Sequence, residues 1–260
     1  GWGTDAKFPM PRTIEFALKR ERQQALRTLD AVGANLFDEH AGGFYRYAAG
    51  EDWSEPHYEK MLDTNAAIVR AFANAYLYTG REEYRQPAAD TIDYLTTTLW
   101  TGDAFAGSQS AGEGASYYAR AATEREDADE PSVDPTLFAD RNALAVDALL
   151  TYHAYTDDDA AGRFAERALD TLDAELIADG EVHHYRDPEE SDDVGESLLL
   201  ADHAHTVAAL TTAREVLGAD ALDGRAIEVA RRVADTAIDE LHAEGSFRDG
   251  PDSGEGLLDR

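Results

Sequence analysis

The stretch MLDTNAAIVRAFANAYLYTG, residues 61–80, and the stretch that follows it, REEYRQPAADTIDYLTTTLW, residues 81–100, decide the fold. The first is apolar around nearly its whole helical circumference, which is typical of a buried helix, and Thr79-Gly80 predicts its end. The second has one apolar stripe at helical spacing, made of Tyr84, Ala88, Ile92, Leu95 and Leu99. Together they predict a hairpin of a buried inner helix and an amphipathic outer helix.

The same order of buried and amphipathic helix recurs along the chain. Residues 137–177 and 197–241 repeat the plan of residues 59–100, and a shorter pair is expected at residues 11–20 and 21–37. Helix pairs of this kind bury their apolar faces by stacking on neighbours, in an α-solenoid or in a closed toroid. We predict an all-α fold: an (α/α) toroid of helical hairpins with about four pairs present, an incomplete (α/α)6 barrel, in a single region over residues 1–260.

Loops rich in glycine and aromatic residues separate the pairs, at residues 42–47, 102–105, 180–185 and 245–247. Their composition predicts short β-hairpins. Such irregular loops at one end of each pair favour the toroid, whose rim they would form, over the solenoid. The acidic, proline-flanked stretch 124–135 is interpreted as a surface insertion.

The composition is strongly acidic, with a formal net charge of −30 and three lysines, Lys7, Lys19 and Lys60. Because the acids are spread over every segment, we interpret them as a surface adapted to high salt; the alternative is a surface for cationic partners. There is no basic stripe to neutralise phosphates, so we expect no nucleic-acid partner. The sequence lacks cysteine and an apolar run that could cross a bilayer, and we expect a cytoplasmic location and no membrane partner.

A polar pair recurs at the start of each inner helix. It is Asp63 with Asn65 in one unit and Asp140 with Asn142 in the next. In the third unit Asp202 keeps the acid, Ala204 takes the place of the amide, and His203 and His205 flank it. These acids could serve only to cap helices. The functional alternative is that inner helices carry them around one cavity.

The densest cluster of reactive side chains is residues 53–60. His57 titrates near neutrality and Glu59 is two residues away, so an extended backbone would turn both toward one cleft. A histidine and a carboxylate suit proton abstraction next to a sugar carbonyl, whereas two facing carboxylates suit glycoside hydrolysis. The structural alternative is a helix start fixed by Pro56 with an ion pair around Lys60.

Four histidines, His183, His184, His203 and His205, invite a metal interpretation. Neither pair has chelating spacing, because adjacent residues of a strand point to opposite faces and residues two apart on a helix do not share one. We predict no metal. Since no phosphate-binding glycine loop or dinucleotide fingerprint is present, we also predict no cofactor.

Several stretches resemble one protein family. They are residues 7–11, 42–47, 56–62, 108–109, 139–143 and 201–202. In this order they are similar to the YyaL-type family, which joins an N-terminal thioredoxin-like domain to a six-hairpin toroid and includes the spermatogenesis-associated thioredoxin-domain proteins. The resemblance covers nearly the whole chain, and residues 57–62 are its most specific part.

The resemblance implies a thioredoxin-like domain upstream of residue 1, covalently attached in the full-length protein, and further helix pairs downstream of residue 260. The toroid itself resembles the N-acylglucosamine 2-epimerase and cellobiose epimerase group, whose sites use histidines at the cavity mouth. The sequence departs from the family pattern at Thr64, at residues 110–112 and at Arg141. These departures favour a degenerate site.

We therefore hypothesise a carbohydrate-active site with epimerase-like or isomerase-like chemistry, with glycoside hydrolysis as a lesser alternative. The predicted catalytic residues are His57, Glu59, Asp140, Asp202 and His203. The predicted residues that bind the small-molecule ligand, a sugar, are Tyr45, Arg46, Trp53, Asn65, Asn142 and His184. The alternative function is a non-catalytic scaffold that binds a ligand or partner for the thioredoxin-like domain.

Overall fold

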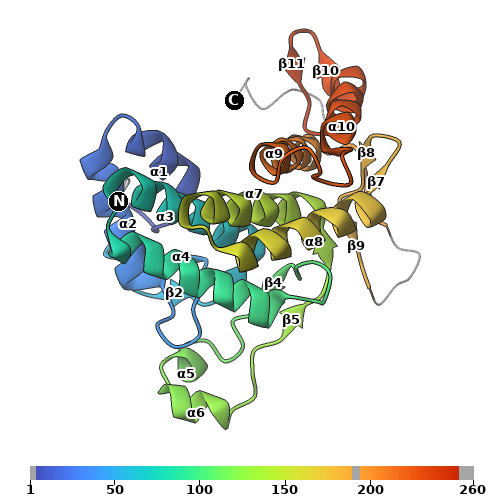
Figure 1. Ribbon diagram of the computed structural model, residues 1–260. Helices are drawn as coiled ribbons and strands as arrows, with labels where there is room; N and C mark the ends of the chain where they lie inside the picture. Colours follow the sequence, from blue (N-terminus) through green and yellow to red (C-terminus); the bar gives the residue numbers. More distant parts are fainter. Residues whose placement is uncertain (1–3, 189–193, 252–260) are drawn as a thin grey trace. The chain divides into compact units, whose positions relative to one another are not determined.

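The computed structural model describes residues 4–188 and 194–251 (Figure 1). Its contacts divide the chain into two compact units. Unit 1 comprises Gly1–Trp100 and Gly107–Asp134, and unit 2 comprises Thr101–Ala106 and Pro135–Arg260. Each unit holds two of the predicted helix pairs, and each is described by itself.

Unit 1 contains two long helix pairs and two small antiparallel sheets. The helices are α1 (Pro11–Leu18), α2 (Arg22–Leu36), α3 (Leu62–Thr79), α4 (Glu82–Tyr94) with its π-helical end η1 (Leu95–Leu99), α5 (Ala115–Tyr118) and α6 (Ala122–Glu126). The strands are β1 (Tyr47–Ala48), β2 (Pro56–His57), β3 (Lys60–Met61), β4 (Ser108–Gln109) and β5 (Val133–Asp134). Helix α1 packs on α2 and α3, and α3 packs on α4. Strand β1 pairs with β2, and the second sheet has the order β3-β4-β5.

Unit 2 repeats the same plan. Its helices are α7 (Ala139–Thr156), α8 (Asp159–Leu176), α9 (Leu200–Val216) and α10 (Ala226–Leu241). Its strands are β6 (Leu137–Phe138), β7 (Ile177–Ala178), β8 (Glu181–Val182), β9 (Tyr185–Arg186), β10 (His242–Ala243) and β11 (Ser246–Phe247). Helix α7 packs on α8 and α9, and α9 on α10. The strand pairs β6-β9, β7-β8 and β10-β11 are all antiparallel.

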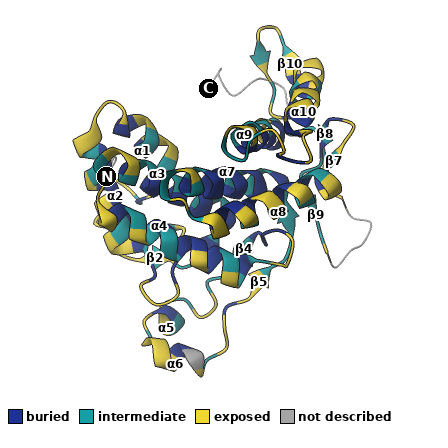
Figure 2. Ribbon diagram, viewed as in Figure 1, coloured by how far each residue is buried: buried dark blue, intermediate teal, exposed yellow. Residues whose placement is uncertain are grey.

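The four predicted helix pairs are confirmed, and the burial of α3, α7, α8 and α10 follows the predicted pattern (Figure 2). Helices α3 and α7 are buried on most faces, whereas α8 and α10 bury one stripe, which in α10 includes Val229 and Val233. Helix α3 ends as predicted, because Gly80 takes a left-handed backbone (φ 66°) that a glycine adopts without strain. Helix α9 departs from the prediction of a fully buried inner helix, since its residues Val207 and Val216 are only half-buried.

The loop predictions hold in part. Residues 42–47, 180–185 and 245–247 contribute to short strand pairs or bridges, but residues 102–105 form a turn closed by the bond from Thr101 N to Ala104 O at 2.9 Å. The stretch 124–135 is more than a surface insertion. It contains strand β5, and Arg125 and Pro131 are buried.

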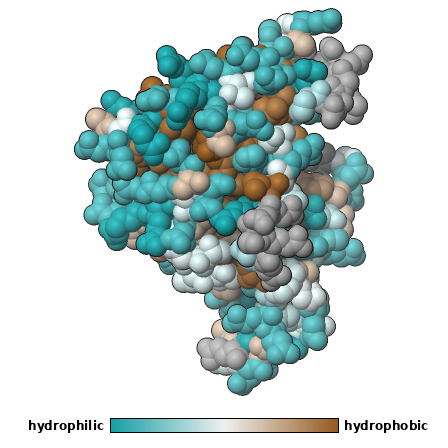
Figure 3. Space-filling model, turned by 90° about the vertical axis from the view of Figure 1, so that its right-hand side faces the viewer, coloured by the Kyte–Doolittle hydropathy of each residue, from teal (hydrophilic) through white to brown (hydrophobic). Residues whose placement is uncertain are grey.

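Hydrophilic residues cover most of the face shown in Figure 3. This agrees with the interpretation that the acidic residues, which are spread over the whole sequence, form a solvated surface. Among the described residues, no helix has the length and apolar character that crossing a bilayer requires.

Candidate functional site

Asn65 lies in the first turn of α3 and is completely buried. Its amide oxygen accepts a hydrogen bond from the backbone N–H of Phe44 at 2.6 Å. Its amide nitrogen donates to the carbonyl oxygens of Phe44 at 3.0 Å and Met61 at 2.9 Å. These bonds fasten the loop that precedes the helix to the helix start, and we call the arrangement the loop clamp.

Asn142 forms the same clamp at the start of α7. Its oxygen accepts from the N–H of Phe105 at 2.9 Å, and its nitrogen donates to the carbonyls of Phe105 at 2.9 Å and Phe138 at 3.0 Å. Like Asn65, it is completely buried. The recurrence of this amide along the sequence therefore has a structural cause, because each inner helix must hold the loop that comes before it.

His203 takes the place of the amide in the third unit. Its Nδ1 lies 2.9 Å from the carbonyl oxygen of Leu199, four residues earlier, and its Nε2 lies 3.4 Å from the N–H of Val182. A carbonyl only accepts, so Nδ1 carries the proton and Nε2 accepts from Val182. Burial lowers the pKa of His203, which favours this neutral ring.

The alignment that places Ala204 opposite the two asparagines is therefore wrong by one residue. Asp63 and Asp140 are the second residues of their helices, whereas Asp202 is the third residue of α9. Asn65, Asn142 and His203 are each 0% exposed, and their polar atoms are bonded to backbone. These bonds give the three side chains a structural role, because they hold the preceding loop against the start of the helix.

Asp140, His184 and Asp202 come together at the starts of α7 and α9. His184 Nδ1 lies 3.0 Å from Oδ2 of Asp202, and Asp202 Oδ1 accepts the backbone N–H of Asp140 at 3.2 Å. The Asp202 side chain is 1% exposed and that of His184 is 30% exposed. A buried carboxylate thus orients a partly exposed imidazole, which is the arrangement of an assisted general base.

Strand pairing brings His184 to this place. Phe138 pairs with Tyr185, and the N–H of Ala139 donates to the carbonyl oxygen of His184 at 2.9 Å, so the residue before β9 stands beside the first turn of α7. The sequence marks His184 as a loop histidine but does not reveal this long-range pairing. Its partnership with Asp202 is therefore a finding of the structure.

The electrostatics of this cluster favour sharing a proton near neutral pH. Burial raises the pKa of Asp202 to about 7, with the charge of Asp140 acting in the same direction and His184 in the opposite one. One ligand atom from each residue lies within 4.8 Å of the others, a spacing that a metal ion could bridge. Because Asp202 already bonds to His184 and to Asp140, we interpret the group as an acid–base cluster.

His57 and Glu59 form a second pair, in unit 1. His57 Nδ1 lies 3.9 Å from Glu59 Oε2, and the side chains are 44% and 33% exposed. Glu59 Oε2 is buried and has no hydrogen-bond partner among the described residues. The His57 ring stacks on Tyr47 at 4.1 Å between centroids. The predicted proximity of the histidine and the carboxylate is thus present, with one carboxylate oxygen unsatisfied.

The remaining predicted ligand-binding residues have different surroundings. Tyr45 is buried, with its ring against Tyr58 and Tyr118, and Arg46 is exposed. Trp53 is half-buried and its backbone N–H donates to Gly50 O at 3.1 Å. These residues lie in unit 1 with His57, and the Asp140 cluster lies in unit 2.

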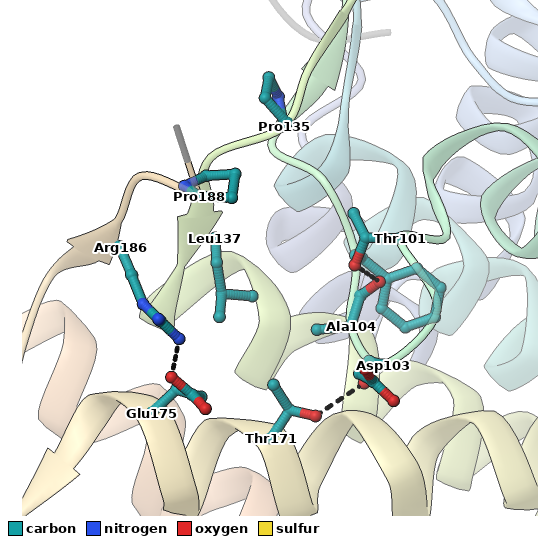
Figure 4. A pocket seen from close by; sticks show the side chains of 10 residues that line it. Thr101, Asp103, Ala104, Pro135, Leu137, Thr171, Glu175, Arg186 and Pro188 are labelled. Atoms are coloured by element: carbon teal, nitrogen blue, oxygen red, sulfur yellow. Dashed lines mark hydrogen bonds and ion pairs between the residues drawn. The ribbon is translucent and has the colours of Figure 1, made fainter. Parts of the chain in front are cut away.

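Unit 2 has a pocket of about 320 Å³ beside α8 (Figure 4). Leu137, Phe105 and Pro135 contribute its apolar lining. Glu175 pairs there with Arg186, and the Thr171 hydroxyl donates to the carbonyl oxygen of Asp103 at 2.9 Å. None of the predicted site residues lines this pocket.

Known proteins resemble the chain in sequence and in fold. No protein-family model matches it. Spermatogenesis-associated protein 20 of Mus musculus is 31% identical over 112 residues, which cover 38% of this chain and 14% of that protein. Cellobiose 2-epimerase of Bacteroides fragilis is 33% identical over 84 residues, 32% of this chain and 21% of that enzyme.

The structure of a sugar epimerase from a ruminal bacterium superposes with a TM-score of 0.75 at 12% identity, over 95% of this chain and 64% of that one. The chain thus spans less than two thirds of each of these proteins. At this identity the match establishes fold alone. The predicted fold class is confirmed: the chain has the (α/α)-toroid fold that sugar epimerases share.

Proposed function

We propose that the chain is the toroid region of a sugar-acting enzyme with epimerase-like or isomerase-like chemistry, joined to a thioredoxin-like domain in the full-length protein. The observation that carries the proposal is the bond between partly exposed His184 and buried Asp202 beside Asp140. The likeness in fold to sugar epimerases supports the substrate class.

In this proposal His184 abstracts the proton from the carbon next to a sugar carbonyl. Its Nδ1 faces Asp202, so Nε2 receives the proton, and the Asp202 carboxylate stabilises the imidazolium that forms. Asp140 is a neighbouring carboxylate that favours this positive charge. The imidazolium then returns the proton to the substrate. His57 and Glu59 stay proposed as a separate acid–base pair in unit 1.

Replacing His184 by alanine is expected to lower sugar turnover about 10²-fold to 10⁴-fold, the usual contribution of a general base. In the active protein, kcat should rise as the pH increases through about 7, because Nε2 of His184 can act as a base only after the His184–Asp202 pair has lost one of its two protons and keeps the other between Nδ1 and the carboxylate. The measurement is turnover of a panel of reducing sugars by the full-length protein in high salt, with pH profiles.

His153→Ala is the control, because His153 lies in the last turn of α7, at the opposite end of that helix from Asp140. Its Nδ1 lies 2.9 Å from the backbone oxygen of Asp158. Unchanged turnover in the His184 variant would remove His184 from the chemistry. If the wild-type protein binds sugars, seen as a rise in Tm, but converts none, the non-catalytic scaffold is the correct function.

We also propose that the acidic surface suits the protein to high salt. Raising potassium chloride from about 0.1 M to about 2 M is expected to increase the Tm, because the screening length falls from about 10 Å to a few Å and the repulsion within a net charge of −30 weakens. Sucrose is the control, because it is excluded from the protein surface and stabilises folded proteins without screening charge. A Tm that does not depend on potassium chloride would contradict this proposal.

A further inference from the structure

The segment of residues 110–132 leaves and re-enters unit 1 through one narrow neck. Strand β4 leads into it and strand β5 leads out, and Ser108 pairs with Asp134 and Gln109 with Val133. The Ser110 N–H donates to Ser132 O at 2.8 Å, which extends the neck. Helices α5 and α6 lie within this segment (Figure 1).

Two side chains attach the segment to the rest of unit 1. Among the side chains that the structure describes between residues 111 and 131, only Tyr118, Arg125 and Pro131 are buried. Tyr118 and Arg125 are 6% and 7% exposed, and Pro131 lies at the neck, where its carbonyl oxygen accepts from Gln109 Nε2 at 3.4 Å. Figure 2 shows the exposed faces of α5 and α6 around them. So small a buried contact favours local detachment of this segment from the rest of unit 1.

Arg125 makes the polar part of the attachment. Its Nη1 donates to both carboxylate oxygens of Asp38, at 2.9 Å and 2.8 Å, and its Nη2 donates to the carbonyl oxygen of Tyr118. Asp38 is 2% exposed and also accepts from Lys60 Nζ at 2.8 Å. The carboxylate therefore joins a cation of the segment to a cation of the unit beneath it.

Tyr118 makes the apolar part. Its ring stacks on Tyr58 at 5.0 Å between centroids and meets Tyr45 edge-on at 5.2 Å. It also lies 5.6 Å from Lys60 Nζ, which is 4.5 Å from the ring of Tyr94 on another side. Lys60 is completely buried, and Tyr118 is the residue of the segment whose ring helps to cover it.

We propose that residues 111–131 are a lid, latched by the Arg125–Asp38 pair, whose opening uncovers Lys60 and the tyrosines around it. This inference does not depend on the proposed function. It needs only that the two attachments release together while the neck stays paired.

The backbone at the neck suits a hinge. Gly112 and Gly114 have φ values of 53° and 59°, a region that residues with a Cβ seldom adopt. A Cβ on Gly112 would lie 3.1 Å from Pro131 on the opposite side of the neck. The glycine therefore permits both the close approach and a change of backbone angle at the base of the lid.

The test is the rate at which Lys60 is acetylated by an N-hydroxysuccinimide ester at pH 8, read by peptide mass spectrometry. The chain has three lysines, so exposed Lys19 is an internal reference for reagent activity. We expect Lys60 in the intact protein to react at least about 100-fold more slowly than Lys19, because it reacts only from the open state. Arg125→Gln should raise the Lys60 rate about 10-fold or more and leave Lys19 unchanged.

Arg120→Gln is the matched control, since Arg120 pairs with exposed Glu113 within the segment and does not contact Asp38. It should leave the Lys60 rate unchanged. Hydrogen exchange separates a lid from general unfolding: in Arg125→Gln, residues 111–131 should lose protection while α3 keeps it. An unchanged Lys60 rate in Arg125→Gln, or equal loss of protection in α3, would overturn the proposal.

Discussion

Asp38→Asn is expected to lower the free energy of unfolding by about 3–5 kcal/mol, the range for removing one partner of a buried ion pair. Asparagine keeps the size of the side chain but leaves Lys60, 0% exposed, and Arg125, 7% exposed, without their shared counter-charge. Chemical denaturation at constant high salt measures the loss.

The pH dependence gives this prediction a second readout. In the intact protein, burial lowers the pKa of Lys60 to about 8 although Asp38 opposes it, and burial is unopposed by Asp38 in the variant. Between the folded and unfolded pKa of Lys60 the unfolded chain binds more protons, so stability rises with pH. Folded Asp38→Asn loses its Lys60 proton at a lower pH than the intact protein does. The deficit of the variant should therefore shrink as the pH rises to about 8 and stay constant above it, where Lys60 is neutral in both folded proteins.

Asp103→Asn is the matched control for this charge removal. Asp103 pairs with Arg167, and the two side chains are 66% and 62% exposed, so the loss should stay below about 1 kcal/mol. Equal losses in the two variants would show that the Asp38 network does not behave as a buried ion pair.

Asn142→Ala is expected to cost about 2–4 kcal/mol, because it removes the buried hydrogen bonds of the Asn142 amide to the backbone of Phe105 and Phe138. The same experiment on α9 compares two replacements of His203. His203→Asn should retain more stability than His203→Ala, since an amide performs this task in α3 and α7. The measurement is again the free energy of unfolding by denaturant.

Asn74→Ala is the control for the loss of an amide from an inner helix. Asn74 is only half-buried on α3, where it donates to Glu15 at 2.9 Å, so a loss below about 1 kcal/mol is expected. If Asn142→Ala were as mild as this control, the loop clamp would not be an important source of stability.

The helix pairs were predictable because their signal is periodic and local. Leu172 and Leu176 lie on one buried stripe of α8 because a separation of four residues places two side chains on the same face of a helix. Gly80 ends α3 because a glycine adopts the left-handed backbone conformation without strain. The ion pair around Lys60, which is part of the structural alternative for residues 53–60, is present, and its partner Asp38 lies 22 residues away.

The candidate site was less predictable, because its contacts depend on register and on distant pairing. The start of α9 puts His203 where α3 and α7 have asparagine, and residue type alone does not show this shift. Arg125 reaches Asp38 across 87 residues through a loop that the sequence marks only as acidic. The partnership of His184 with Asp202 depends on the pairing of β6 with β9, which are far apart in the sequence.

The loop clamps also bear on the order in which the chain folds. Each joins the loop after one outer helix to the next inner helix, over sequence separations of 21, 37 and 21 residues. These are short distances, and a fold built from such contacts has low contact order and forms rapidly. Each pair has its docking point ready as soon as the following inner helix leaves the ribosome, so the toroid should assemble from its N-terminal pair onward as synthesis proceeds.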